Sequence, residues 1–226
     1  MKMFTKFSAV ALVVVFAVPA LVHADSFVGT KWTNRGNFKT TFDGKNRTMY
    51  VGEFTLQLRD DSGQLLDDGE WFTGFCVDPW QGAKVGGELP VEFVSPEEYN
   101  SGLQIAWMFE TYYTEESTKS EIAGLQLAFW DMIVDADYNL NSGDFRVRRG
   151  NTTAITYAES YLASVPQTFS SSDIASLNSS YVIGKTGTHQ DFIVKAEVAP
   201  VPEPATVLLL GVGVIGILGV ARKRNK

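Results

Sequence analysis

The sequence predicts an α+β fold, namely an antiparallel β-sandwich or barrel with a small group of helices on one side. The first observation is the order of the patterns, because strand-like segments come first, helical segments follow, and strand-like segments return near the C-terminal end. The second is the turn chemistry, since Gly and Asp clusters at 60–63 and 82–87 separate the strand-like segments. Helices grouped beside an antiparallel sheet are typical of the α+β class.

The strand prediction is clearest at 51–59. Apolar Phe54, Leu56 and Leu58 alternate there with polar neighbours, which is the period of a strand with one buried face. The same reasoning predicts further strands at 27–33, 72–77, 89–94, 180–185 and 191–198.

Capping boxes predict where two helices begin. In each box a hydroxyl residue is followed three positions later by glutamate, first at Ser95 to Glu98 and again at Thr118 to Glu121. A third helix is predicted at 153–163, because its apolar residues share one face and Pro166 follows its end.

The N-terminal segment, residues 1–24, has the features of a signal peptide. Lys2 and Lys6 precede an apolar run, and Val22-His23-Ala24 fits the small-residue requirement of signal peptidase. Cleavage is therefore expected after Ala24, and the protein is expected to be exported.

The C-terminal end has three consecutive parts. A linker at 199–204 contains Pro202-Glu203-Pro204, an uncharged run at 205–221 is long enough for a transmembrane helix of roughly 25 Å, and a basic tail at 222–226 should remain cytoplasmic. This order resembles the PEP-CTERM sorting signal. The resemblance implies processing by an exosortase and delivery to the cell surface or extracellular matrix of a Gram-negative bacterium. The alternative is a plain single-pass anchor, which explains the apolar run but not the Pro-Glu-Pro motif.

Residues 25–198 are expected to form one extracellular domain. From residue 25 to residue 200 there are 13 Lys and Arg against 25 Asp and Glu, a net charge of −12, so nucleic acid is not expected as a partner. Only His189 remains after signal cleavage, which argues against zinc sites and most histidine-dependent catalysis. The sequence predicts no cofactor.

The chain has a single cysteine, Cys76, so a disulfide within the chain is impossible. Gln126 lies on the same predicted helix face as Ile122 and Phe129, which centres it on the buried side. A buried carboxamide without a partner costs about 1–3 kcal/mol. Gln126 is therefore either a hydrogen-bonded core residue or the target of the Cys76 thiolate, whose attack would release ammonia and leave an internal thioester.

Three sequence blocks resemble the signature of the bacterial thioester domain, also called the TQxA domain, of surface adhesins. They are Phe75-Cys76-Val77-Asp78, Leu103-Gln104-Ile105-Ala106-Trp107 and Leu125-Gln126-Leu127-Ala128-Phe129-Trp130. The resemblance implies a thioester between Cys76 and Gln126, a supporting role for Gln104, and Trp130 as the wall behind the reactive helix. It further implies covalent attachment to an amine on an unidentified surface or matrix target, by a binding module and not by an enzyme.

Two other functions compete with this hypothesis. One is a non-covalent structural protein of the extracellular matrix or biofilm that keeps Cys76 reduced and buried. The other is a cysteine hydrolase that uses Cys76, His189 and Asp191.

The segment after the second helix contains alternating oxygen ligands at Asp135, Asp137, Asn139 and Asn141. Calcium loops use this spacing, but an EF-hand requires glycine where Leu140 lies and glutamate where Arg146 lies. A polar turn is therefore favoured over a calcium loop, and no metal is predicted.

Overall fold

The computed structural model describes residues 24–60, 63–65 and 67–195. The expected linker, membrane helix and basic tail lie outside these residues, as does the expected signal peptide except for Ala24, where the first strand begins. Among the helices of the described residues, none is long and apolar enough to cross a membrane.

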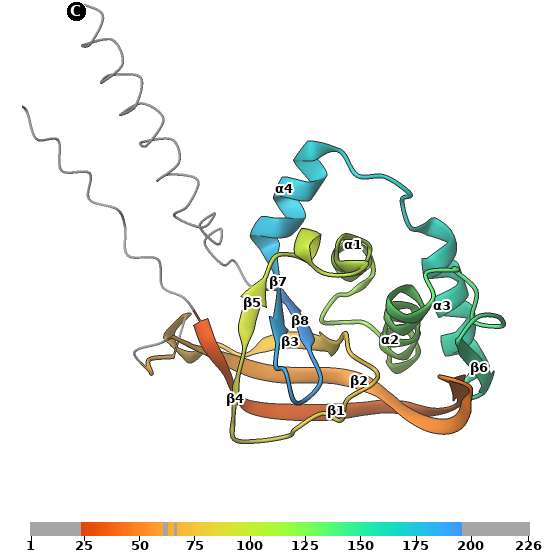
Figure 1. Ribbon diagram of the computed structural model, residues 1–226, viewed down its shortest axis with the longest axis horizontal. Coiled ribbons are helices and arrows are strands. Elements are labelled where there is room, and N and C mark those ends of the chain that lie inside the picture. The colour runs from red at the N-terminus through yellow and green to blue at the C-terminus, as the bar shows by residue number, and fades with distance from the viewer. Residues whose placement is uncertain (1–23, 61–62, 66, 196–226) are drawn as a thin grey trace, which may run out of the picture.

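Within the described residues an antiparallel sheet of eight strands packs against four α-helices, which confirms the predicted α+β class (Figure 1). The strands are β1 Ala24–Phe42, β2 Lys45–Asp60, β3 Phe72–Cys76, β4 Glu88–Pro90, β5 Glu92–Val94, β6 Phe145–Arg149, β7 Tyr181–Lys185 and β8 Phe192–Lys195. The helices are α1 Gly102–Tyr112, α2 Lys119–Val134, α3 Thr152–Ser164 and α4 Ser171–Ser180.

The sheet is nearly closed into a barrel. Its order is β4-β1-β2-β3-β8-β7-β5, and β6 pairs separately with β1. Only Val91 separates β4 from β5, yet these two strands lie at opposite ends of the order, β4 on β1 and β5 on β7. The prediction of a single strand at 89–94 is thus wrong in detail. Two short strands lie there, and the chain passes through Val91 from one edge of the sheet to the other.

The β1–β2 hairpin is longer than predicted. Its strands meet at Asp43 and Gly44, whose φ angles of 53° and 69° suit a two-residue hairpin turn. The predicted strands at 27–33 and 51–59 are therefore parts of two strands of 19 and 16 residues. The far end of β1 also pairs with β6, which the sequence did not predict.

Two of the three helix predictions are confirmed. The Thr118 capping box begins α2, and α3 covers the predicted segment with Asn151 as its N-cap. The Ser95 box is present, but it begins a short 3-10 helix, Pro96–Glu98, and α1 starts only at Gly102. A Cβ at Gly102 would lie 2.2 Å from the Pro96 carbonyl oxygen, so this tight junction requires glycine.

Helix α2 lies at the centre of the domain, between the sheet and α3 (Figure 1). All of its residues from Ile122 to Ile133 are buried, whereas the sequence predicted one buried stripe. Gly124 permits the close contact with α3, because a Cβ there would lie 2.8 Å from the Ala154 carbonyl oxygen. The polar side chains of this stretch, Gln126 and Asp131, are consequently buried.

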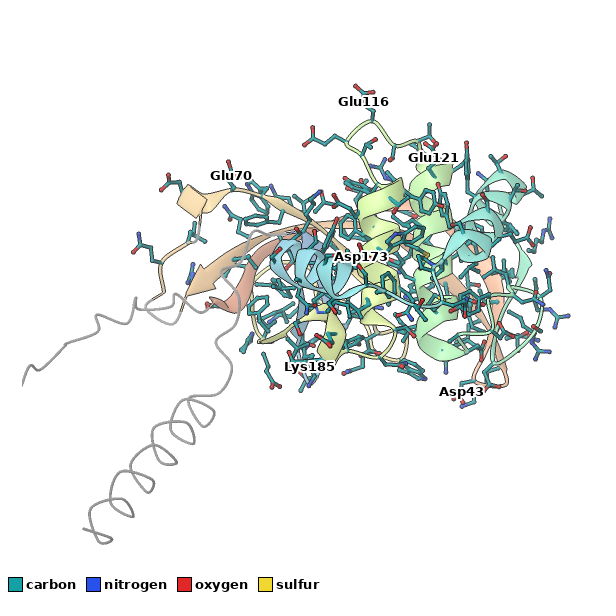
Figure 2. All side chains as sticks on the ribbon, turned by 90° about the horizontal axis from the view of Figure 1, so that it is seen from above. Asp43, Glu70, Glu116, Glu121, Asp173 and Lys185 are labelled. Atoms are coloured by element: carbon teal, nitrogen blue, oxygen red, sulfur yellow. The ribbon has the colours of Figure 1, made fainter. Side chains whose placement is uncertain are left out.

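Charged side chains surround this core. Figure 2 shows the labelled acidic residues on separate elements at the periphery, with Glu116 between α1 and α2, Asp173 on α4 and Asp43 in the β1–β2 turn.

Candidate functional site

Cys76 is the last residue of β3, and its backbone N–H and C=O groups have no hydrogen-bond partner on a neighbouring strand. The Val77 N–H donates to the Asp191 carbonyl on the β8 side at 2.9 Å. Alternation along an antiparallel strand then directs the N–H and C=O of Cys76 away from β8. On that side β2 pairs with β3 only as far as Gly74, so no strand meets Cys76 there.

The side chain of Gln126 occupies this gap. Its Oε1 accepts from the Cys76 N–H at 3.2 Å, and its Nε2 donates to the Cys76 carbonyl at 2.8 Å. The carboxamide thus stands in for the peptide group of a missing strand. The two residues that the sequence proposed as a pair are 50 positions apart in the chain and lie side by side in a fully buried site.

The sulfur of Cys76 has two polar neighbours. Trp130 donates its Nε1–H to Sγ at 3.4 Å, and Sγ–H donates to the Asp78 carbonyl at 3.4 Å. Burial raises the pKa of the Cys76 thiol to about 12, and the Trp130 hydrogen bond opposes this rise only in part. An unmodified Cys76 is therefore a neutral thiol at physiological pH.

A polar group that the sequence reasoning missed lies just beyond Cys76. The Asp78 carboxylate accepts from the Trp80 N–H at 3.0 Å and from Gln81 Nε2 at 2.7 Å. The Tyr99 hydroxyl is 3.0 Å from the Val77 carbonyl and 3.1 Å from Asp191 Oδ2, and burial raises the pKa of Tyr99. These contacts fix the chain that directly follows the cysteine. Asp78 could have been singled out, because it belongs to the Phe-Cys-Val-Asp block.

The remaining predicted site residues are placed differently. Gln104 is half-buried on α1, and its side chain makes no hydrogen bond within the described residues. His189 bonds to its own turn, with Nδ1 2.9 Å from Thr188 Oγ1, and within the described residues no hydrogen bond connects it to Cys76 or Asp191. The alternative catalytic triad therefore lacks its connecting hydrogen bonds.

The segment with alternating oxygen ligands forms the connection between α2 and β6, as a series of hydrogen-bonded turns. Asp137 Oδ1 accepts from the Asn139 N–H, and Asn139 Oδ1 accepts from the Asn141 N–H, both at 3.0 Å. Leu140, at the position where an EF-hand has glycine, is a buried core residue. The segment is a polar turn without the EF-hand form.

Two cavities open close to the Cys76 region. One cavity, of about 320 Å³, is lined by Trp130 and by mostly apolar side chains of the sheet and of the loop that contains residues 83–85. Its other lining residues are Trp32, Met49, Tyr50, Phe54, Ala83, Val85 and Gln190. Trp130 thus both lines this cavity and bonds to the sulfur of Cys76.

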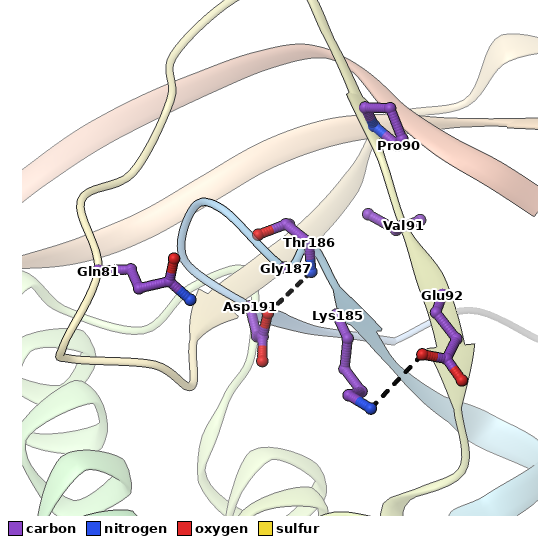
Figure 3. A pocket seen from close by; sticks show the side chains of 8 residues that line it. All are labelled: Gln81, Pro90, Val91, Glu92, Lys185, Thr186, Gly187 and Asp191. Atoms are coloured by element: carbon purple, nitrogen blue, oxygen red, sulfur yellow. Dashed lines mark hydrogen bonds and ion pairs between the residues drawn. The ribbon is translucent and has the colours of Figure 1, made fainter.

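The second cavity, of about 500 Å³, is more polar (Figure 3). It lies where β5 and β7 meet the turn before β8, with Lys185 paired to Glu92 at 3.5 Å. Asp191 also lines it and accepts from the Thr186 N–H at 2.8 Å. Both interactions are drawn as dashed lines in Figure 3.

Comparison with known proteins identifies one segment of the chain. Residues 200–224 match the PEP-CTERM protein-sorting motif. No curated protein and no solved structure matches the chain. The match includes the Pro-Glu-Pro motif, the apolar run and most of the basic tail, so the protein carries a PEP-CTERM signal for export across the membrane and surface sorting by an exosortase.

Proposed function

We propose that this exosortase substrate carries an internal thioester between Cys76 and Gln126 and uses it to attach covalently to an amine at the cell surface or in the extracellular matrix of a Gram-negative bacterium. The observation that carries the proposal is the pair of hydrogen bonds, 3.2 and 2.8 Å, between the Gln126 carboxamide and the backbone of Cys76. They hold an electrophilic carbonyl carbon beside the residue that bears the only thiol of the chain.

The arrangement suits formation of the bond. The Cys76 N–H that bonds to Oε1 would polarise the carbonyl and stabilise the oxyanion of the tetrahedral intermediate. The Trp130 N–H would stabilise negative charge that develops on sulfur. The S–C bond forms, the C–N bond breaks, and the thiol proton moves to the departing nitrogen, which leaves as ammonia.

The buried environment suits an uncharged group at Cys76. Burial raises the pKa of the Cys76 thiol to about 12, because a thiolate is poorly solvated there. A thioester has no ionisable proton and bears no charge, so it has no such penalty. The same enclosure excludes the water that would hydrolyse it.

Capture of a target reverses the roles of the groups. An amine attacks the thioester carbonyl, an amide forms, and Cys76 is released as a thiol. One molecule reacts once, so the protein acts as a covalent binding module and not as an enzyme. The aromatic cavity of about 320 Å³ offers an approach, because Trp130 both lines it and donates its indole N–H to the sulfur.

A second function is favoured by the same hydrogen bonds. They satisfy both ends of the Gln126 carboxamide, so Gln126 also fits the role of a structural residue that completes the edge of β3. Cys76 would then remain a buried thiol in a non-covalent matrix protein.

Intact mass spectrometry of the exported protein separates the two functions. A thioester lowers the mass by one ammonia, and methylamine treatment should add one methylamine and expose one titratable thiol. The Cys76→Ser variant is the control and should have its full mass. A wild-type protein with full mass, and with a thiol that reacts only after unfolding, would establish the structural function instead.

A further inference from the structure

The strongest unexplained feature lies at the C-terminal end of α2, outside the Cys76 site. Asp131 is on the buried helix and is 0 % exposed. Neither of its carboxylate oxygens forms a hydrogen bond of good geometry within the described residues, although the backbone N–H groups of Tyr138 and Asn139 lie close enough to favour its ionised form. A buried carboxylate without a partner is among the most costly groups a protein can contain, so it requires a compensating charge or ligand.

No side chain supplies that charge. Within the described residues no lysine, arginine or histidine forms an ion pair with Asp131, Asp135 or Asp137. The last turn of α2 also contains no basic residue, although the C-terminal end of a helix dipole favours cations. Burial, together with the nearby carboxylates of Asp137 and Asp135, raises the pKa of Asp131 to about 7.

The three carboxylates converge instead of avoiding one another. One oxygen from each of Asp131, Asp135 and Asp137 lies within 4.8 Å of the other two. Calcium binds oxygen at about 2.3–2.6 Å, so two ligands on opposite sides of one ion are separated by about 5 Å. A single calcium ion can therefore contact all three.

Two of the three carboxylates are already oriented by the loop. Asp135 accepts from the N–H groups of Asp144 at 2.7 Å and Phe145 at 2.6 Å. Asp137 Oδ2 accepts from the Ser142 hydroxyl at 2.7 Å. Hydrogen bonds of this kind orient metal ligands and leave lone pairs for the ion. Asp131, which lacks them, is the group whose partner is missing.

We propose that Asp131, Asp135 and Asp137 form a calcium site that fixes the end of α2 to the loop leading into β6. The site differs from an EF-hand, because its deepest ligand comes from the preceding helix and Leu140 fills the glycine position. An exported protein encounters calcium at concentrations that suit extracellular modules, whose dissociation constants are on the order of 10⁻⁴–10⁻³ M. The proposal does not depend on the thioester.

The test uses the full exported chain in mild detergent, freed of metal by EDTA and dialysis. Calcium at roughly 10 mM should raise Tm by roughly 3–10 °C for a site of this affinity. Isothermal titration with calcium chloride should give one site per chain. Magnesium at equal concentration should give a much smaller shift.

Asp131→Asn keeps the shape of the side chain and removes its charge. This variant should lose the calcium-dependent shift, and without calcium it should be at least as stable as the wild type. Asp137→Asn, at an exposed position, should weaken binding at least tenfold without disturbing the core. The control is Asp68→Asn. Asp68 is exposed in the β2–β3 connection, and asparagine tolerates the positive φ angle of this position.

Absence of binding at roughly 10 mM calcium, or an undiminished shift in both Asp131→Asn and Asp137→Asn, would overturn the site. An equal shift with magnesium would overturn its assignment to calcium.

Discussion

Replacing Gln126 by glutamate tests the carboxamide that pairs with Cys76. A protonated glutamic acid has nearly the same shape as glutamine, so it can accept from the Cys76 N–H and donate its O–H to the Cys76 carbonyl. It lacks an ammonia to release and cannot form the thioester in the proposed way. The Gln126→Glu variant therefore keeps the contact and removes the chemistry.

The expected magnitude follows from the burial of this position, which is 1 % exposed. The carboxyl must remain protonated in the folded protein, so its folded pKa rises above the value of about 4.3 that it has when unfolded. Holding the proton costs about 4 kcal/mol at pH 7 and about 1 kcal/mol at pH 5. Stability is thus regained as the pH falls toward the unfolded pKa and is lost as the pH rises.

Urea unfolding at both pH values measures this difference, with Cys76→Ser as the reference. That reference lacks the thioester and keeps glutamine, so other carboxylates affect both proteins alike. Relative to it, Gln126→Glu should gain about 3 kcal/mol between pH 7 and pH 5, and its mass should show no ammonia loss. A pH-independent difference would refute the assignment of Gln126 to a buried pairing with Cys76, and an ammonia loss in the variant would refute the thioester.

Three further predictions test the site and the sorting signal. Cys76→Ser should lower Tm by roughly 8–16 °C, because a thioester closing a loop of 50 positions contributes about 4 kcal/mol to stability on the cross-link model. Calorimetry measures this change, and an unchanged Tm would argue against a cross-link. Ala83→Trp should fill the aromatic cavity and slow methylamine uptake at least tenfold in a mass-based time course, with Lys84→Trp as the adjacent control; equal rates would exclude this approach. Glu203→Ala should leave export intact but keep the protein in the membrane fraction on immunoblots, whereas normal surface delivery would show that sorting does not depend on the motif.

The sequence predicted elements whose signals are local. The period of two at Phe54, Leu56 and Leu58 and the capping box at Thr118 each gave a correct strand or helix start. Helix α4 was missed because Leu177 is its only buried residue, although Ser170 and Asp173 form a third capping box. The closure of the sheet through Val91 could not be predicted, because it depends on which distant strands the two short segments meet.

The candidate site was predictable only in part, for the same physical reason. Chemistry and resemblance suggested that Cys76 and Gln126 form a pair, but their hydrogen bonds exist because β2 stops pairing with β3 at Gly74. No local pattern reports where a strand loses its neighbour. Asp131 was not predicted, although its spacing of four positions from Asp135 along a helix brings the two side chains to the same face.

Helix α2 connects the two proposals. Because this helix is buried, each of its polar side chains requires a partner. Gln126 has the backbone of Cys76, and the Trp130 N–H has the Cys76 sulfur, so both are satisfied by one residue of β3. Asp131, one position further along the same buried helix, forms no hydrogen bond of good geometry within the described residues. A buried polar group persists only where something compensates it. For the first two side chains the compensation is on the neighbouring strand, and for the third it is the cation that the loop after α2 is arranged to share.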